Sequence, residues 1–304
     1  MHTFSIVARD ARTGEMGVAI QSHWFAVGAL CPWAEAGTGA IATQSMVEVS
    51  YGPMGLQSLR NGKSAMETLN FLIGKDKQQA LRQVAIVDAK GNIAVHTGKR
   101  CIAEAGHIIG NGFSVQANMM INKDVLPAMS TAYQKREGNL ANKMLAALKA
   151  GQSAGGDIRG KQSACMIIVG GERSNEPWNF VRINLRVHDH SEPIKELERL
   201  LLLQSAYNAM NEGDTLLAKN QTQKAMKKYS SAAKLAPEIE ELPFWQAVTL
   251  AENGQIDEAL PIFKWIFKRN PNWGILIQRL PASGLLKINK DILDRILALI
   301  PKKE

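Results

Sequence analysis

The sequence predicts a mixed α+β protein, with a four-layer αββα sandwich followed by an all-helical domain. Three observations lead to this expectation. Strand patterns punctuated by glycine dominate residues 1–190, and helical patterns come in adjacent pairs, unlike the strict alternation of a doubly wound fold. Several of these strands are apolar on both faces, which is typical of strands buried on both sides. Beyond Pro193 there are helix formers and no convincing strand, so we expect domains at residues 1–194 and 195–304.

The expected elements follow one another as hairpin, strand, helix pair, hairpin, strand, helix pair and hairpin. Strands are expected at residues 4–10, 16–22, 39–45, 82–88, 92–98, 112–119, 163–171 and 180–189. Helices are expected across residues 52–74, with a break at Gly62, and at residues 124–137 and 140–150. Two antiparallel sheets packed face to face, each covered outside by one helix pair, bury these elements most economically.

Residues 195–304 carry an internal repeat with a period of 34 residues. The repeated pairs are Leu216 and Leu250, Ala225 and Ala259, Tyr229 and Phe263, Lys234 and Lys268, and Pro237 and Pro271. A small residue early in a second helix, an aromatic residue four later and a proline after its end are typical of tetratricopeptide (TPR) repeats. Two such units, flanked by helices near residues 195–210 and 290–300, predict a short helical array. Residues 205–285 of this array are a candidate docking region for a protein partner.

Composition limits the classes of function. The net charge is +8, but residues 197–304 hold 15 basic and 12 acidic residues, and neither half has a dense basic run interleaved with aromatics. We therefore expect no nucleic-acid partner. No secretion signal is visible, and no apolar run approaches the roughly 20 residues that span a bilayer, so we expect a soluble cytoplasmic protein. Cys31, Cys101 and Cys165 lack metal-type spacing and are interpreted as reduced thiols.

Motifs for common cofactors are absent from the sequence. It contains no GxxxxGK[ST] phosphate loop, no GxGxxG between a strand and a helix, and no GxSxG elbow. His188 and His190 share one face of an expected strand, so a metal pair is geometrically feasible. Polar residues at a strand end are the simpler interpretation. We therefore expect neither a cofactor nor a metal.

Hydroxyl and amide groups are dense near the ends of the expected strands. Thr3 heads the first strand, and a terminal threonine can act as nucleophile and, through its own α-amine, as base. Asn118 could donate a hydrogen bond to a developing oxyanion. Alternation places Thr3 and Ser5 on one face of their strand, and Thr43 and Ser45 on one face of theirs. The expected substrate-binding residues are Ser22, His23, Thr43, Gln44, Ser45, Asp157, Arg159 and Gln162.

Two of these assignments have a plain alternative. Asp157 and Arg159 stand in a glycine-flanked loop, where Arg159 could hold a substrate carboxylate in its fork. The same two residues could equally stabilise a turn as an ion pair. His23 directly follows Ser22, and successive strand residues point to opposite faces. His23 is therefore interpreted as a pocket wall or ligand contact, and not as a hydrogen-bonding partner of Ser22.

Long stretches of the chain resemble one protein family. TFSIVARD, GEMGVAIQSHWFAVGA, PWAEAGTGAIATQS, RQVAIVDAKGNIAVHTGKRC, GNGFSVQANMM and GGDIRGKQSA are similar to the DUF1028 family, from about Thr3 to Leu200. DUF1028 proteins are uncharacterised members of the N-terminal-nucleophile (Ntn) hydrolase superfamily. The resemblance therefore implies the αββα sandwich and maps the nucleophile onto Thr3.

The first residues of the chain depart from the family pattern. Many relatives begin Met-Thr, so that removal of methionine exposes the threonine, whereas here His2 intervenes. Methionine is normally removed only before a small residue. Thr3 is then internal unless a further cleavage removes Met1 and His2.

Three functions stay open at this level. The first is an Ntn-type amidohydrolase acting on a small amide, such as an N-acyl or glutamyl-type compound. The second is a non-catalytic Ntn-like scaffold that binds a small metabolite, with the TPR-like repeats docking a protein. The third is an adaptor that acts through the repeats alone. Fold does not imply function, so the resemblance supports the architecture more than any reaction. We also expect copies of the chain to associate, because Ntn-like sandwiches often pair.

Overall fold

The computed structural model describes residues 3–301. Contacts divide the chain into two compact units, Met1–Leu200 and Leu201–Glu304, and the division falls inside helix α5 (Pro193–Ala218). Each unit is therefore described by itself. Among residues 3–301, no helix is both long enough and apolar enough to cross a membrane.

The first unit contains a six-stranded antiparallel sheet with the strand order β10-β9-β2-β1-β8-β7. Its strands are β1 (Thr3–Arg9), β2 (Met16–Ser22), β7 (Gly106–Gly110), β8 (Phe113–Ala117), β9 (Ser163–Val169) and β10 (Val181–Val187). Strand β1 is internal and pairs with β2 on one side and β8 on the other. Its first and last residues therefore lie at opposite ends of the sheet.

The first unit also contains a four-stranded antiparallel sheet with the order β3-β4-β5-β6. Its strands are β3 (Pro32–Glu35), β4 (Gly39–Ser45), β5 (Arg82–Asp88) and β6 (Ile93–Thr97). The predicted mixed α+β class is confirmed, and each predicted strand segment is present. Strands β3 and β7 were not predicted. One begins with proline and the other is bounded by two glycines, residues that strands generally disfavour.

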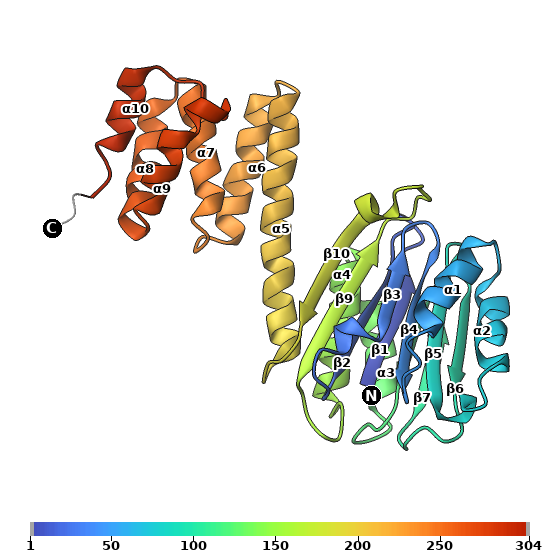
Figure 1. Cartoon of the computed structure of the whole chain (residues 1–304). Helices are drawn as coiled ribbons and strands as arrows, with labels where there is room; N and C mark the ends of the chain where they lie inside the picture. Colours follow the sequence, from blue (N-terminus) through green and yellow to red (C-terminus); the bar gives the residue numbers. More distant parts are fainter. Residues whose placement is uncertain (1–2, 302–304) are drawn as a thin grey trace. The chain divides into compact units, whose positions relative to one another are not determined.

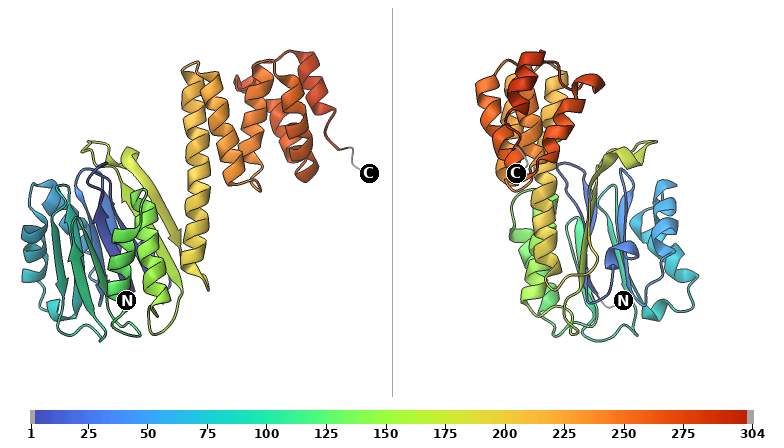
Figure 2. Two further views of the ribbon diagram at one scale, coloured as in Figure 1. Left: turned by 180° about the vertical axis from the view of Figure 1, so that it is seen from behind. Right: turned by 60° about the vertical axis from the view of Figure 1, so that its left-hand side comes forward.

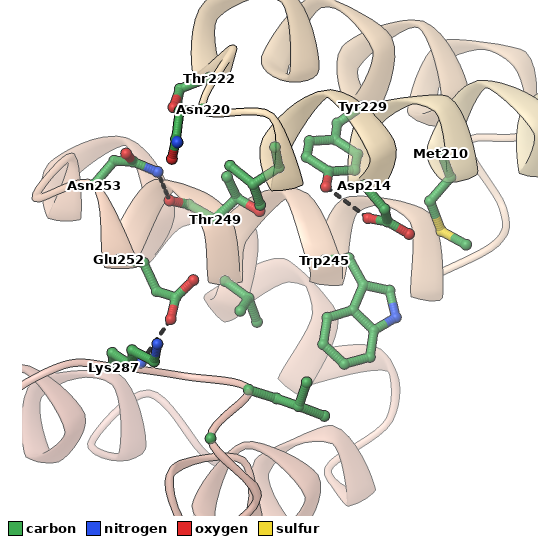
Figure 3. Close-up of a pocket in the computed structure, with 14 residues that line it drawn as sticks. Met210, Asp214, Asn220, Thr222, Tyr229, Trp245, Thr249, Glu252, Asn253 and Lys287 are labelled. Carbon is green, nitrogen blue, oxygen red and sulfur yellow. Dashed lines mark hydrogen bonds between the residues drawn. The ribbon is translucent and has the colours of Figure 1, made fainter.

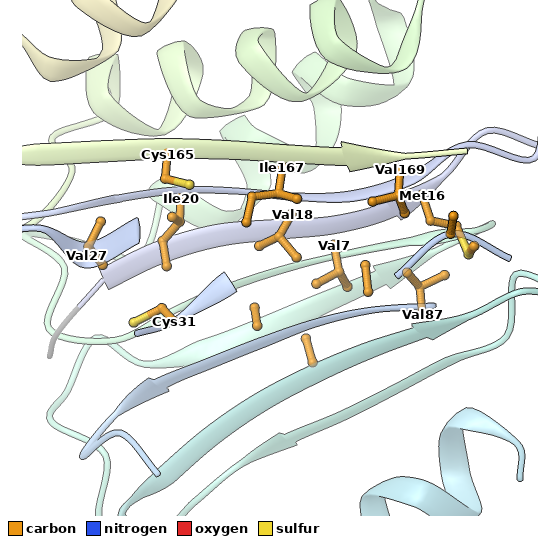
Figure 4. Packing of buried hydrophobic residues seen from close by; sticks show 14 residues of the cluster. Val7, Met16, Val18, Ile20, Val27, Cys31, Val87, Cys165, Ile167 and Val169 are labelled. Carbon is orange, nitrogen blue, oxygen red and sulfur yellow. The ribbon is translucent and has the colours of Figure 1, made fainter. Parts of the chain in front are cut away.

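The two sheets face each other across an apolar core (Figure 4). Val7, Val18 and Ile20 project into it from the larger sheet, while the small residues Ala42 and Ala85 project from the smaller one. Only every second residue of each strand contributes, because strand side chains alternate between the two faces. The alternate positions of these strands face the helices outside.

A helix pair covers the outer face of each sheet (Figures 1 and 2). The smaller sheet carries α1 (Tyr51–Arg60) and α2 (Ala65–Gly74), and the larger sheet carries α3 (Val125–Lys135) and α4 (Leu140–Ser153). Local sequence explains where these helices begin. Ser64 forms a capping box with Glu67 before α2, and the Asn139 side chain accepts a backbone hydrogen bond at the start of α4.

The second unit is mostly helical. After α5 it contains α6 (Thr222–Leu235), α7 (Glu241–Glu252), α8 (Ile256–Arg269), α9 (Asn272–Arg279) and α10 (Lys290–Leu297). The 34-residue spacing relates α6 to α8, and Ala225, Tyr229, Ala259 and Phe263 are all buried. The Tyr229 ring lies so close to Gly213 that a Cβ there would come within 2.7 Å of it. A small residue at position 213 therefore permits α5 and α6 to pack.

Candidate functional site

Four small polar residues form a row at one end of the six-stranded sheet. The strand register pairs Thr3 with Ser22, and Ser22 with Ser163. Asn118 extends the row just beyond β8, where it and Thr3 exchange backbone hydrogen bonds of 3.3 and 3.1 Å. Thr3 Oγ1 donates to Ser22 Oγ at 3.1 Å, and all four residues are fully buried. Thr3 thus lies inside the fold with a second hydroxyl beside it.

Buried amide side chains connect this row to the second sheet. Gln44 Nε2 donates to the backbone oxygen of Thr3 at 3.2 Å and to Gln83 Oε1 at 2.7 Å. Asn118 Nδ2 donates to the same Gln83 oxygen at 2.8 Å. Gln44 and Gln83 come from the smaller sheet, whereas Thr3 and Asn118 belong to the larger one. The amides therefore crosslink the two sheets where the apolar core ends.

The same network continues along β1 and β8. Ser5 Oγ donates to Gln44 Oε1 at 2.6 Å and accepts from Gln116 Nε2 at 2.5 Å. Gln83 Nε2 lies within 3.0 Å of three oxygens, one each from β6, β7 and β8. Gln83 is therefore the centre of the network, because its oxygen accepts two hydrogen bonds and its nitrogen donates to several strands. A fully hydrogen-bonded polar cluster of this kind can be buried at little cost.

Two further predicted binding residues lie on β4 beside Gln44. Thr43 pairs in register with Val84, which belongs to the apolar cluster beneath α1 and α2. Thr43 Oγ1 donates to a backbone oxygen of the following loop at 3.2 Å. Ser45 ends the strand with a φ of 67°. Of these three residues, Gln44 is the one with a hydrogen bond to Thr3.

The remaining predicted binding residues gather around the end of β2. The backbone N–H of His23 donates to Asp157 Oδ2 at 3.2 Å, and that of Gln162 donates to the backbone oxygen of Ser22 at 3.1 Å. Arg159 donates from Nη2 and Nε to the two oxygens of Asp157, at 2.7 and 3.0 Å. The Asp157 side chain is completely buried, whereas 28% of the Arg159 side chain is exposed. The Arg159 guanidinium is therefore hydrogen-bonded to Asp157. Ser22 connects this loop to Thr3, because its backbone oxygen accepts from Gln162 and its hydroxyl accepts from Thr3.

The central residue of the network, Gln83, was not among the predicted site residues. The strand RQVAIVD nevertheless contains a signal for it. Alternation places Gln83 on the same face as Ala85 and Val87, so it is a polar residue on an otherwise apolar inward face. The side chain of Gln21, in contrast to that of Gln83, takes no part in this hydrogen-bond network. It is fully buried, and neither of its amide atoms has a hydrogen-bond partner among the described residues.

The titratable groups near the site include two buried thiols and a histidine. Burial raises the pKa of Cys31 and of Cys165 to about 12, so both stay protonated thiols at neutral pH. Burial, together with the charge of His96, lowers the pKa of His107, whose Nδ1 lies 2.9 Å from Thr97 Oγ1 at the edge of the network. Within residues 3–301, no three metal-ligating side chains gather into a site.

The second unit holds a separate pocket of about 680 Å³ (Figure 3). Trp245 lines it together with two hydrogen-bonded pairs. Tyr229 Oη donates to Asp214 Oδ1 at 2.6 Å, and the backbone N–H of Lys287 donates to Glu252 Oε1 at 2.7 Å. Burial and the bond to Asp214 raise the pKa of Tyr229. Aromatic, apolar and charged groups therefore share one concave surface.

Comparison with known proteins places the first unit among relatives. The profile of a family described as a "Family of unknown function (DUF1028)" matches residues 3–197. The crystal structure of protein SPO2555 from Silicibacter pomeroyi, assigned to the same family, is similar with a TM-score of 0.60 and 30% sequence identity. That similarity covers 66% of this chain and 85% of the other. The search of curated proteins found no match.

Proposed function

The chain belongs to the DUF1028 family of unknown function, and from this premise we propose that its first unit is an Ntn-type amide hydrolase. Its substrate would be a small amide, such as an N-acyl or glutamyl-type compound. The two facing sheets with outer helix pairs support the analogy with the αββα sandwich of that superfamily. The observation that carries the proposal is the hydroxyl of Thr3, at the head of an internal strand and 3.1 Å from Ser22 Oγ.

In the proposed reaction, Thr3 Oγ1 attacks the amide carbonyl after cleavage has removed Met1 and His2. These two residues lie outside the described range. The freed α-amine of Thr3 takes the hydroxyl proton and passes it to the departing amine, leaving an ester on Thr3. Water then hydrolyses the ester, releases the acid and restores the hydroxyl. A reference pKa of about 8 suits an α-amine to act as base near neutral pH.

Asn118 is the proposed oxyanion donor. Its side-chain amide is fully buried, and its Nδ2 already donates to Gln83 Oε1. That bond holds the amide in one orientation, as electrostatic stabilisation of a transition state requires. The loop of His23, Asp157, Arg159 and Gln162 is the proposed substrate-binding segment, because Ser22 connects it to Thr3.

The deciding experiment compares two forms of the full-length protein. One is released from a cleavable fusion so that it begins at Thr3, and the other keeps Met1 and His2. γ-Glutamyl-4-nitroanilide and a series of N-acyl-4-nitroanilides serve as probes. We expect turnover only in the form that begins at Thr3, loss of roughly 10³-fold or more in Thr3→Val, and retained activity in Thr3→Ser. Equal turnover with Met1 and His2 in place, verified by mass spectrometry, would contradict the terminal-threonine mechanism.

A second candidate is a non-catalytic scaffold that binds a small metabolite at the same place. It is favoured by the internal hydrogen bonds of Asn118 and Arg159, which already engage both side chains. A metabolite bound with equal affinity by the wild type and by Thr3→Ala, with no turnover in either, would select this function.

For the second unit, we propose a TPR-like array that docks a protein through residues 205–285. The 34-residue spacing between α6 and α8 and the pocket beside Trp245 support it. A partner cross-linked to the wild-type chain should be lost in Trp245→Ala and retained in the control Trp178→Ala. Trp178 belongs to the first unit and is 68% exposed.

A further inference from the structure

A second concave site lies at the opposite end of β1 from Thr3. It is a cleft of about 460 Å³, which we call the Arg9 cleft. Its lining includes the cations Arg9, Arg12, Lys90 and Lys143, the carboxylate Asp10 and the aromatic Tyr133. The lining residues come from the end of β1, from the β1–β2, β5–β6 and β7–β8 turns, and from the region of α3 and α4. Segments distant in sequence therefore converge on one small surface.

The Arg9 cleft concentrates positive charge and compensates it only in part. Four of its lining residues are cationic, and Asp10 is the single acidic residue among them. Within residues 3–301, none of the four cations forms a salt bridge. The Lys143 ammonium instead lies over the Tyr133 ring, 5.0 Å from its centroid. Like charges repel one another unless counter-charge is bound, so this arrangement favours an anionic ligand.

Arg9 adds an unsatisfied donor to the site. Its Nε is buried and has no hydrogen-bond acceptor among the described residues. The guanidinium group passes between two glycine turns, and a Cβ added at Gly14 or at Gly91 would lie 3.8 or 4.0 Å from its Nη2 or Nη1. Within residues 3–301, no ion pair engages this guanidinium group. An oxyanion bound in the cleft could accept two parallel hydrogen bonds from it.

Asp10 is held mainly by its own turn and also lies in the field of two of these cations. Two backbone N–H groups, of Arg12 and Thr13, donate to its Oδ1 at 2.8 and 3.0 Å. Burial alone would raise its pKa, but these bonds and the charges of Arg12 and Lys143 bring the pKa below its ordinary value. The Asp10 carboxylate is thus turned toward its own turn and neutralises only part of the surrounding charge.

We propose that the Arg9 cleft is a binding site for a small molecule carrying a dianionic oxygen group, either a phosphate ester or a polycarboxylate. The volume suits a compact ligand, and four cations line the cleft. A nucleic acid would require a longer basic track. This site is separate from the Thr3 site, so its occupancy does not depend on the proposed hydrolase activity.

The test is calorimetric titration of the full-length protein at constant ionic strength, with pyrophosphate, inorganic phosphate and citrate as probes and potassium chloride as the blank. We expect saturable binding of pyrophosphate or citrate, and the stronger of the two identifies the ligand source as phosphoryl or carboxylate. Arg9→Gln and Lys143→Gln should each weaken it roughly 10- to 100-fold, the effect of losing one charge-assisted hydrogen bond. The control Lys99→Gln, at an exposed lysine outside the cleft, should bind as the wild type does.

Two outcomes would overturn the proposal. One is equal affinity in Lys143→Gln and Lys99→Gln, which would indicate non-specific charge attraction. Lys143 lies on a helix surface, so its replacement should not impair folding. The comparison of Lys143→Gln with Lys99→Gln therefore tests the proposal even if Arg9→Gln proves unstable. The other is the absence of saturable binding for all three probes.

Discussion

The two ends of β1 bury polar groups in opposite ways. At the Thr3 end, neutral hydroxyls and amides hydrogen-bond one another across two sheets. At the Arg9 end, four cations converge with no ion pair among the described residues. The difference shows that many neutral polar groups can be buried together when they hydrogen-bond one another. Charged groups without an ion-pair partner are instead found where solvent or a ligand can reach them.

Sheet geometry explains why the Thr3 end can be polar. Facing sheets lie about 10 Å apart, a gap that two opposed glutamine side chains can bridge. Gln44 and Gln83 extend from the smaller sheet toward Thr3 and Asn118 on the larger one. Further along the same strands, Ala42 and Ala85 are small and the core is apolar. One pair of strands thus passes from a dry core to a polar network within a few residues.

The largest effect is expected from breaking the network at its centre. Gln83→Leu keeps the side-chain volume but removes the acceptor of Gln44 and Asn118 and the donor to three oxygens. Leaving several buried groups unpaired should destabilise the first unit by about 3 kcal/mol. The measurement is the free energy of unfolding in urea, followed by circular dichroism.

The matched control for this change is Gln57→Leu, at an exposed position of α1. It should alter the free energy of unfolding by less than about 0.5 kcal/mol. If both variants were equally stable, the network would make no net contribution and the proposed contrast between the two ends of β1 would fail.

An intermediate effect is expected at the other end. Arg9→Met breaks no ion pair and removes a buried donor that lacks an acceptor, so the free energy of unfolding should change by less than about 1 kcal/mol. The informative comparison is Arg82→Met. The Arg82 side chain is 8% exposed and donates from Nε to Asp76 Oδ2 at 2.7 Å, so its loss should cost about 2 kcal/mol. Similar losses in the two variants would show that Arg9 has a structural partner.

The smallest effect concerns acid stability. The folded-state pKa of Asp10 is below its ordinary value, so the folded protein favours the ionised carboxylate. This contribution is fully present above the unfolded pKa of about 4 and is lost as the pH falls through the folded pKa. Asp10→Asn should therefore lower the urea midpoint slightly at pH 7, and the two proteins should converge as the pH approaches 3. A difference that grew on acidification would refute the assigned sign.

Local sequence patterns predicted most of the elements. Alternating and apolar strand patterns were sufficient for β1, β2, β4 and β5, and glycine breaks separated the paired helices. The sequence predicted the individual site residues less accurately than it predicted the strands and helices. The segment TQS on β4 indicated polar side chains, but Gln44 contacts Thr3 whereas Thr43 pairs with a residue of the helix-facing cluster. A shift of one residue changes the face of a strand, so the pattern alone did not select between them.

By itself, the sequence determined the mixed α+β class, the order of eight strands and two helix pairs, and the 34-residue spacing that relates α6 to α8. These features depend on short-range periodicity, which each segment carries within its own residues. Only the tertiary structure decided that Gln83 joins two sheets, and that Arg9, Arg12, Lys90 and Lys143 share one cleft. Those groupings depend on strand register and on the packing of segments far apart in the chain, and short-range periodicity does not specify such contacts.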